Sequence, residues 1–230
     1  MGFKPVGILG GMGPEATILL QQRLLATVEA RDDGDHIPLL IDMNPQVPSR
    51  IAHLIDGTGE DPAPVLSRMA QRLDRAGATA LAMPCNTAHH YAPAIRAATP
   101  LPFLDMVALS VALAAQELNP GARVGLLASP AVEQAGVFTP HLSAHGLTAL
   151  WPADGDAMLA AIRSVKSHGP TPGAIHSLQN AARDLTAQGA ELLFVACSEF
   201  SLLSHALSVG LPVIDTVDVL ADAIRDHALT

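Results

Sequence analysis

The sequence is poor in charged side chains, and those it has are mostly acidic. Its 230 residues include 13 Lys and Arg against 22 Asp and Glu, which gives a formal net charge of −9. No block of cations occurs anywhere in the chain. Because nucleic-acid binding requires clustered cations that neutralise phosphates, we exclude a nucleic-acid partner. An anionic substrate would need a locally placed cation, and Arg50 and Lys166 are the candidates.

Long apolar runs are also missing. None reaches the roughly 18 residues that a membrane-spanning helix requires, so we expect no membrane partner. The first residues, 1–5, lead directly into an apolar, strand-like run, which is unlike a signal peptide. The apolar content of 49% is that of a globular chain. We therefore expect a globular protein of the cytoplasm.

Cysteine is the third scarce residue, with only Cys85 and Cys197 present. In a reducing compartment both are expected to be free thiols, since structural disulfides are rare there. Two cysteines alone do not complete a zinc site. His89 lies four residues after Cys85, where it shares a helical face, but no further metal ligands are evident. We expect no metal, and we interpret His89 and His90 as residues that pack in the core or support the site from behind the residues that line it.

Short apolar runs alternate with helical patterns along the whole chain. This alternation predicts an α/β fold of mostly parallel sheets flanked by crossover helices. The expected strands are 6–9, 37–43, 78–83, 124–127 and 192–196, and the expected helical segments are 14–30, 63–76, 87–98, 132–142, 157–166, 172–188 and 216–227.

The two halves of the chain resemble each other at three places, in order and at nearly constant spacing. The matched segments are 6–10 with 124–128, 82–86 with 194–198, and 101–105 with 211–215. Such a repeat predicts two pseudo-symmetric α/β domains. We expect the first domain to comprise 1–98 plus 210–230 and the second to comprise 99–209.

The repeat puts Cys85 and Cys197 at the ends of equivalent strands. Ligands of open α/β sheets bind beyond the carboxyl ends of the strands, so both thiols are expected in one cleft between the domains, on opposite sides of it. The alternative is that both are ordinary buried core residues, the commonest fate of a free cysteine. Their equivalent positions favour the first interpretation.

Two thiols on opposite faces of one carbon could exchange its proton without rotating the substrate. This is what a racemase requires, and the thiol pKa can be lowered at a helix N-terminus. Both Cys85-Asn86-Thr87 and Cys197-Ser198-Glu199 resemble strand-to-helix junctions. Asn86, Thr87 and Ser198 could bind a carboxylate or serve as helix caps. Glu199 could tune the thiol, contact a substrate amine, or be a first-turn carboxylate favoured by the helix dipole.

The loop 42–50 follows a buried strand and carries Gln46 and Arg50 between prolines. A loop stiffened in this way suits a bidentate carboxylate clamp, and the alternative is a solvated surface arginine. Lys166 lies near a helix end, where the helix dipole alone favours a cation.

The segment 7–14 is a glycine-rich turn that contains Met12 and leads into a helix. It lacks the Gly-x-Gly-x-x-Gly spacing of dinucleotide sites, and the acidic residue expected about 20 positions later is displaced to Asp42. A turn that lets a small anion approach the backbone is the better interpretation.

The segments Gly7–Thr17, Met83–Tyr91 and Ala196–Glu199 together closely resemble the aspartate/glutamate racemase family. The resemblance extends over essentially the whole chain. It implies two pseudo-symmetric α/β domains, no pyridoxal phosphate or other cofactor, and a two-base mechanism that uses Cys85 and Cys197. It also implies that Arg50 and Lys166 hold the substrate carboxylates and that the protein is a homodimer.

The sequence departs from the family pattern at three places. Ser198 stands where the family usually has Thr, Ser49 replaces a usual Asp, and segment 127–132 lacks a Thr-rich turn. The third departure includes Ser129, which we expect to line the site, so it affects the choice of substrate more than the type of reaction. The predicted substrate-binding residues are Met12, Gln46, Arg50, Asn86, Thr87, Ser129, Lys166, Ser198 and Glu199.

We therefore expect cofactor-independent racemisation of an acidic amino acid, with aspartate ahead of glutamate. One alternative is a related two-cysteine isomerase or lyase that acts on maleate or hydantoins. The pair of cations favours a dicarboxylate over a hydantoin. The other alternative is a non-catalytic amino-acid-binding protein on the same scaffold.

Overall fold

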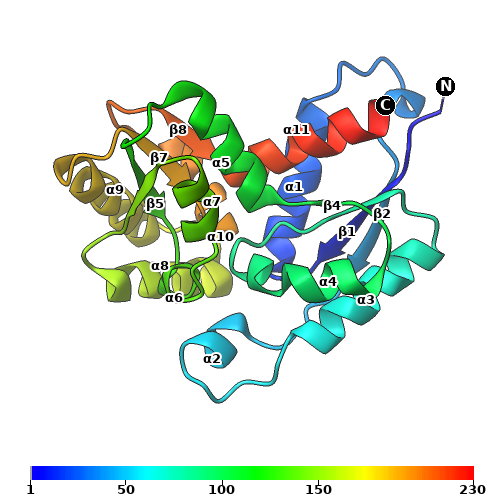
Figure 1. Ribbon diagram of the computed structural model, residues 1–230, viewed down its shortest axis with the longest axis horizontal. Coiled ribbons are helices and arrows are strands. Elements are labelled where there is room, and N and C mark those ends of the chain that lie inside the picture. The colour runs from blue at the N-terminus through cyan, green and yellow to red at the C-terminus, as the bar shows by residue number, and fades with distance from the viewer. Residues whose placement is uncertain (1) are drawn as a thin grey trace.

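Two parallel four-stranded sheets form the framework of the computed structural model, which describes residues 2–230 (Figure 1). The first sheet has the order β2-β1-β3-β4 and the second the order β6-β5-β7-β8. The identical order confirms the predicted α/β class and the internal repeat. The strands are β1 (Val6–Gly10), β2 (Leu39–Met43), β3 (Ala80–Ala82), β4 (Phe103–Leu104), β5 (Arg123–Leu127), β6 (Thr148–Leu150), β7 (Leu192–Val195) and β8 (Val213–Asp215).

Helices cover both faces of each sheet. The α-helices are α1 (Pro14–Ala26), α2 (Arg50–Leu54), α3 (Ala63–Arg75), α4 (Ala92–Ala98), α5 (Met106–Glu117), α6 (Pro130–Gln134), α7 (Thr139–Ala144), α8 (Gly155–His168), α9 (Pro172–Ala187), α10 (Ser198–Ser201) and α11 (Thr216–Leu229). Three short 3₁₀ helices complete the described elements: η1 (Asp33–Asp35), η2 (Thr87–Tyr91) and η3 (Ser204–Ala206).

The expected helical segment 132–142 is divided into α6 and α7. Gly136 between them has a φ of +63°, a left-handed conformation that ends the first helix, and Pro140 lies in the first turn of the second. Proline is tolerated there because the first N–H groups of a helix have no partner within it. The expected helix 87–98 likewise begins as η2 and continues as α4.

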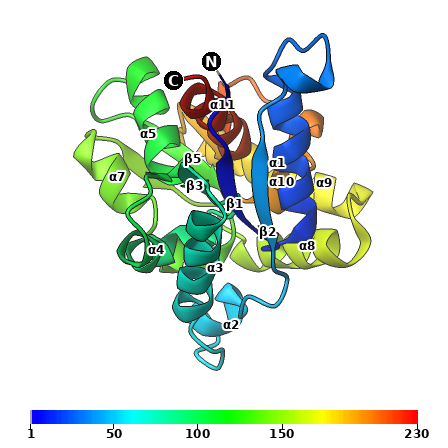
Figure 2. The same ribbon diagram turned by 90° about the vertical axis from the view of Figure 1, so that its right-hand side faces the viewer.

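The hydrophobic core follows the sheets, which are covered on both faces as parallel sheets require. In the first half, Leu66 and Met69 of α3 pack with Leu81 on one face, while Leu20 of α1 packs with Ile8 on the other. Figure 2 faces this half and shows β2 at the sheet edge beside α1. In the second half, α8 and α9 cover one face and α5 and α7 the other.

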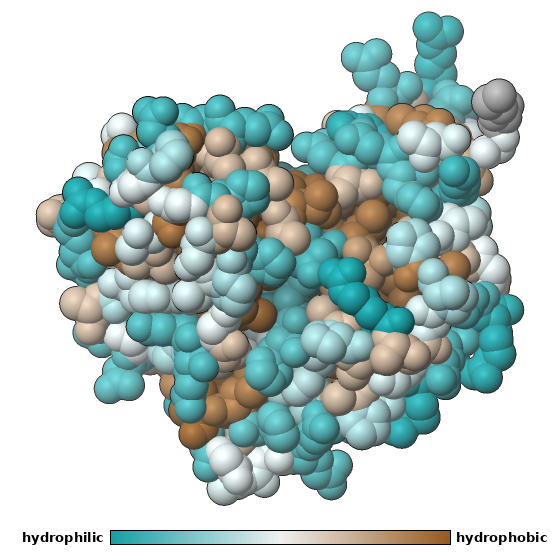
Figure 3. All heavy atoms as spheres, viewed as in Figure 1, coloured by the Kyte–Doolittle hydropathy of each residue, from teal (hydrophilic) through white to brown (hydrophobic). Residues whose placement is uncertain are grey.

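The two halves exchange a helix. Helix α5 follows β4 of the first sheet but packs on the second sheet through Val107 and Val111. Helix α11 follows β8 of the second sheet but packs on the first through Leu220 and Ile224, and Figure 1 shows this last helix crossing to the first half. Exposed hydrophobic side chains gather over α5 and α11 in the hollow between the halves (Figure 3).

The strand pairings correct the expected domain limits. Strand β4 pairs with β3 of the first sheet and strand β8 with β7 of the second. Limits at 98/99 and 209/210 would assign both strands to the opposite half, because the chain changes halves after each strand rather than before it. Met1 lies outside the described residues. It is the first residue of the expected first domain and of the segment 1–5, which we interpreted as unlike a signal peptide.

The matched segments 101–105 and 211–215 have a common structural role. Each ends in an aspartate that caps the helix crossing between the halves: Asp105 Oδ1 accepts from Ala108 N–H of α5 (3.1 Å), and Asp215 Oδ1 accepts from Val217 N–H of α11 (3.0 Å). Such caps satisfy donors that the helix leaves unpaired. Within residues 2–230, no helix is both long enough and apolar enough to span a bilayer.

Candidate active site

A cavity of about 120 Å³ lies between the two halves. It is placed beyond the carboxyl ends of β1, β3 and β7, where ligands of α/β sheets bind. The first half contributes Met12, Ser49, Arg50, Ile51, Cys85 and Thr87, and the second contributes Ile162, Lys166 and Glu199.

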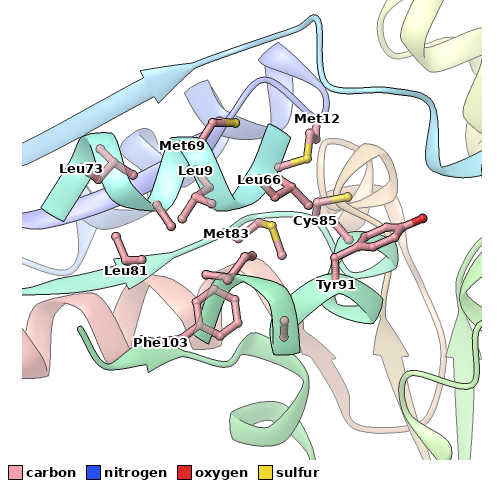
Figure 4. Packing of buried hydrophobic residues seen from close by; sticks show 14 of the residues in the cluster. Leu9, Met12, Leu66, Met69, Leu73, Leu81, Met83, Cys85, Tyr91 and Phe103 are labelled. Atoms are coloured by element: carbon pink, nitrogen blue, oxygen red, sulfur yellow. The ribbon is translucent and has the colours of Figure 1, made fainter. Parts of the chain in front are cut away.

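Cys85 follows β3 and ends the hydrophobic core of the first half. Figure 4 shows its side chain beside Met12, Leu66 and Tyr91 at the end of the packed cluster. Only 7% of the residue is exposed, but it lines the cavity. It is therefore both a buried residue of the core and a residue of the site.

His89 holds the backbone of Cys85 in place. The Met106 N–H donates to His89 Nε2 (3.1 Å), so that nitrogen is the acceptor and Nδ1–H donates to the Cys85 carbonyl (2.9 Å). Burial lowers the pKa of His89 even though Asp105 lies nearby. Both ring nitrogens are occupied, so Cys85 and His89 do not form a metal pair.

His89 is thus the packing residue that we expected. His90, by contrast, is exposed on the surface. No group of three or more His, Cys, Asp or Glu side chains in the described part of the chain is arranged to hold a metal ion.

Cys197 is the N-cap residue of α10 and is equally buried, with 7% of it exposed. Its thiol donates to Glu199 Oε2 (3.1 Å). Burial raises the pKa of Cys197 well above its usual value and the Glu199 carboxylate raises it further, while Lys166 acts in the opposite direction. The expected lowering of the thiol pKa by the helix N-terminus is therefore wrong for Cys197. Cys197 is not among the residues that line the cavity, but its hydrogen-bond partner Glu199 is.

Lys166 lies in the last turn of α8 and forms an ion pair with Glu199. The distance from its Nζ to Glu199 Oε1 is 2.7 Å. Burial lowers the pKa of Lys166, but the Glu199 carboxylate and, when they are ionised, the sulfurs of Cys85 and Cys197 raise it, and the net shift is upward.

Arg50 is the first residue of α2, which the Ser49 hydroxyl caps by accepting from Ala52 N–H (3.2 Å). Its Nη1 donates to the carbonyls of Val47 (3.3 Å) and Pro48 (3.0 Å), so the proline-containing loop fixes the guanidinium. Among residues 2–230 no carboxylate forms an ion pair with Arg50. Its charge therefore remains available to a ligand.

Three further predicted residues are buried next to the strand ends. Asn86 Nδ2 donates to Thr216 Oγ1 (3.0 Å), and the Thr216 hydroxyl donates to the carbonyl of Val195 in β7 (3.0 Å). Asn86 Oδ1 and Ser129 Oγ have no hydrogen-bond partner within the described residues. Neither side chain caps the helix that it precedes, so the capping alternative is wrong for Asn86. Ser198 is also buried. Buried polar atoms without partners are uncommon in folded proteins, and a ligand contact is one explanation for them.

Gln46 does not reach the cavity. Its side chain is exposed, and its backbone N–H donates to Asn44 Oδ1 (3.0 Å). Sequence reasoning missed Ser49, Ile51 and Ile162, which the cavity includes. Ile162 could have been found, because it precedes Lys166 by four residues and such residues share a helix face.

The glycine-rich turn is explained by packing within the chain. Gly11 has a φ of +93°, its N–H donates to Thr17 Oγ1 (2.9 Å), and a side chain there would collide with the backbone of Asn44. The turn directs Met12 into the cavity. These contacts explain why glycine is required at position 11, and the explanation needs no bound dinucleotide.

Comparison with known proteins identifies relatives over almost the whole chain. The sequence model of the Asp/Glu/hydantoin racemase family matches residues 9–224. The broad specificity amino-acid racemase RacX of Bacillus subtilis is 24% identical over 225 residues, which cover 94% of each chain.

Solved structures show the same fold. The aspartate racemase of Picrophilus torridus has a TM-score of 0.86 at 27% identity, covering 98% of this chain and 94% of that one. The glutamate racemase isoform RacE1 of Bacillus anthracis has a TM-score of 0.68 at 16% identity, covering 98% and 80%.

Proposed function

Because this chain belongs to the Asp/Glu/hydantoin racemase family, we propose that it racemises an acidic amino acid, aspartate first and glutamate next. The observation that carries the proposal is the cavity between the halves, which Cys85 lines from the first half and the Cys197 partner Glu199 lines from the second. The similarity to an aspartate racemase supports the substrate class.

We assign the two proton transfers to the two thiols. The Cys85 thiolate takes the proton from Cα, and the Cys197 thiol returns its own proton to the opposite face. The raised pKa of Cys197 suits a group that holds its proton until the transfer. The opposite enantiomer uses the same two groups in reverse. Neither pyridoxal phosphate nor a metal takes part in these steps.

The remaining residues would hold the substrate. Arg50 and Lys166 are assigned to its carboxylates, because a charge-assisted hydrogen bond to a carboxylate is the strongest available anchor. We assign Asn86 Oδ1 and Ser129 Oγ, which have no hydrogen-bond partner in the described chain, to the ammonium and carboxylate groups at Cα, although neither residue is part of the cavity lining. Met12 and Thr87 line the cavity wall, and Ser198 lies buried beside Cys197. A hydantoin offers no carboxylate to the two cations and fits less well.

Deuterium incorporation tests this function directly. The L- and D-enantiomers of aspartate and glutamate are each incubated with the protein in deuterated water. The products are separated on a chiral column, and their deuterium content is measured by mass spectrometry. We expect deuterium at Cα in the product enantiomer of aspartate above all. Binding of the amino acids without any deuterium uptake would contradict the racemase function and favour a non-catalytic binding protein.

Single cysteine variants test the two-base assignment. We expect Cys85→Ser and Cys197→Ser each to lower kcat for racemisation by at least about 100-fold, since each removes one acid/base group. Circular dichroism should show unchanged folding in both variants. A variant that keeps most of its activity would remove that cysteine from the mechanism.

We also propose a homodimer in the cytoplasm. Four of the exposed large hydrophobic residues, Ile18 and Leu25 of α1 with Ile41 and Met43 of β2, lie on adjacent elements, and β2 is the edge strand of its sheet. Unpaired sheet edges with apolar side chains favour association. For the location, the support is that both cysteines are free thiols, as expected in the reducing cytoplasm. Light scattering should give twice the monomer mass, and Ile41→Lys should shift it toward the monomer.

A further inference from the structure

The cation that faces the cavity from the second half already holds a carboxylate. Lys166 Nζ lies 2.7 Å from Glu199 Oε1, a short and strong contact for an ammonium and a carboxylate. The Glu199 side chain is 10% exposed and that of Lys166 is 36% exposed, so the pair lies at the cavity wall rather than in open solvent. Among residues 2–230, Lys166 has no other ion-pair partner.

Glu199 is held at both oxygens. Oε1 forms the ion pair with the Lys166 ammonium, and Oε2 accepts a hydrogen bond from the Cys197 thiol (3.1 Å). Its carboxylate therefore lies between a cation and one of the two thiols. The side-chain carboxylate of a dicarboxylic substrate would contact the same ammonium if Lys166 were its anchor. Two carboxylates in this place would repel each other, since like charges at such distances are unfavourable.

Arg50 differs from Lys166 in this respect. Its guanidinium is fixed by two carbonyl oxygens of its own loop, and no carboxylate of the described chain neutralises it. A substrate carboxylate can bind Arg50 without displacing an anion. A second carboxylate at Lys166 has to share the ammonium with Glu199 or displace it, and Glu199 opposes its binding in either case.

We propose that Glu199 is a specificity-determining residue: an internal carboxylate that competes with the substrate's side-chain carboxylate for Lys166. A dicarboxylic amino acid has to share Lys166 with Glu199 or displace it, while an amino acid with an uncharged side chain leaves the ion pair intact. The pair thus weakens the preference for acidic substrates and admits neutral ones. This inference rests on the proposed racemase function for its role in catalysis, but the competition itself is a binding property.

Binding of two unreactive probes measures the competition. Succinate has four carbons and two carboxylates, and butyrate has four carbons and one. Neither has an amino group or a stereocentre, so neither can be racemised. Their dissociation constants are measured by titration calorimetry at constant ionic strength. We expect Glu199→Gln to bind succinate roughly fivefold more tightly than the wild type, as loss of a partly exposed ion pair would allow, and butyrate within about twofold.

Glu15→Gln is the matched control. Glu15 is an exposed carboxylate on the same side of the glycine turn: a Cβ at Gly13 would lie 3.3 Å from Glu15 Oε2 and 3.8 Å from Glu199 Oε1. The Glu15→Gln substitution removes one negative charge near Glu199 but no ion pair of Lys166, so both probes should bind as they do to the wild type. In Lys166→Met the preference for succinate over butyrate should disappear.

Unchanged or weaker binding of succinate by a folded Glu199→Gln variant would overturn the inference, as would an equal gain in Glu15→Gln. If Glu199→Gln does not fold, Glu199→Ala replaces it in the same titration. The two proposals fail separately, because succinate binding does not depend on racemisation. Absence of deuterium uptake with aspartate, together with the expected succinate result, would reject the proposed function alone.

Discussion

Asp215 is the residue whose burial has the clearest effect on pH dependence. It is 8% exposed, and burial raises its pKa from 3.8 to about 6, although the Ser201 hydroxyl and the Val217 N–H both donate to its Oδ1. Its Oδ2 accepts no hydrogen bond in the described chain, and the nearest cation, Arg23 Nη2, lies 3.9 Å from it. The folded state therefore binds this proton more tightly than the unfolded state does. The resulting stability is fully present below pH 4 and is lost as the pH rises through about 6.

Asp215→Asn should remove this dependence, because the amide carries no charge at any pH. A shift of about two pKa units corresponds to about 3 kcal/mol. We expect the unfolding free energy of the variant, relative to the wild type, to rise by about 2–3 kcal/mol between pH 4 and pH 7.5 in urea titrations. Asp156→Asn, at an exposed first-turn carboxylate of α8, is the control and should show no such trend. A pH-independent difference for Asp215→Asn would mean that the carboxyl titrates normally.

The turn between β1 and α1 shows how one element depends on close packing with another. Gly11 and Gly77 have nearly the same left-handed conformation, with φ values of +93° and +94°. A side chain at Gly77 would meet nothing within 4 Å, whereas one at Gly11 would collide with the backbone of Asn44 after β2. Comparing substitutions at the two glycines therefore distinguishes the cost of a left-handed backbone from the cost of a steric collision.

Gly77→Ala should lower the unfolding free energy by about 1–2 kcal/mol, the cost of a left-handed alanine. Gly11→Ala should cost at least about 3 kcal/mol, since the displaced backbone adds to that strain. Urea unfolding followed by circular dichroism compares them. Equal losses would show that the Asn44 loop yields easily and that only the backbone conformation matters.

At the scale of the whole molecule, the exchange of α5 and α11 joins the two halves into one folding unit. Each sheet is covered by a helix that follows the other sheet, so neither half completes its core alone. Trp151, the single tryptophan, packs against the core of the second half and reports on that half. A change in the first half should therefore be detected by it.

Leu81→Ala tests this coupling, because Leu81 is fully buried in the core of the first half. Removing a buried leucine side chain costs about 2–5 kcal/mol. We expect the urea midpoints from Trp151 fluorescence and from circular dichroism to fall together. A fluorescence transition that stays in place while circular dichroism changes would show that the halves unfold independently.

The sequence by itself determined the features that depend on local pattern and on repetition. Alternating apolar runs predicted the α/β class, and the three matched segments predicted two sheets of equal topology. The same repeat assigned Cys85 and Cys197 to the ends of β3 and β7, because residues that follow equivalent strands occupy equivalent places. Motif resemblance then identified the family, which the match over residues 9–224 confirms.

Only the tertiary structure decided which helix covers which sheet and which charges meet. The crossing of α5 and α11 leaves no local pattern, since their apolar faces would fit either sheet. Gln46 and Arg50 share one loop, yet only Arg50 lines the cavity. The ion pair of Lys166 with Glu199 joins residues 33 positions apart, and burial rather than the helix N-terminus dominates the Cys197 pKa. Charge pairing and desolvation depend on distances across the folded chain, which the order of residues does not contain.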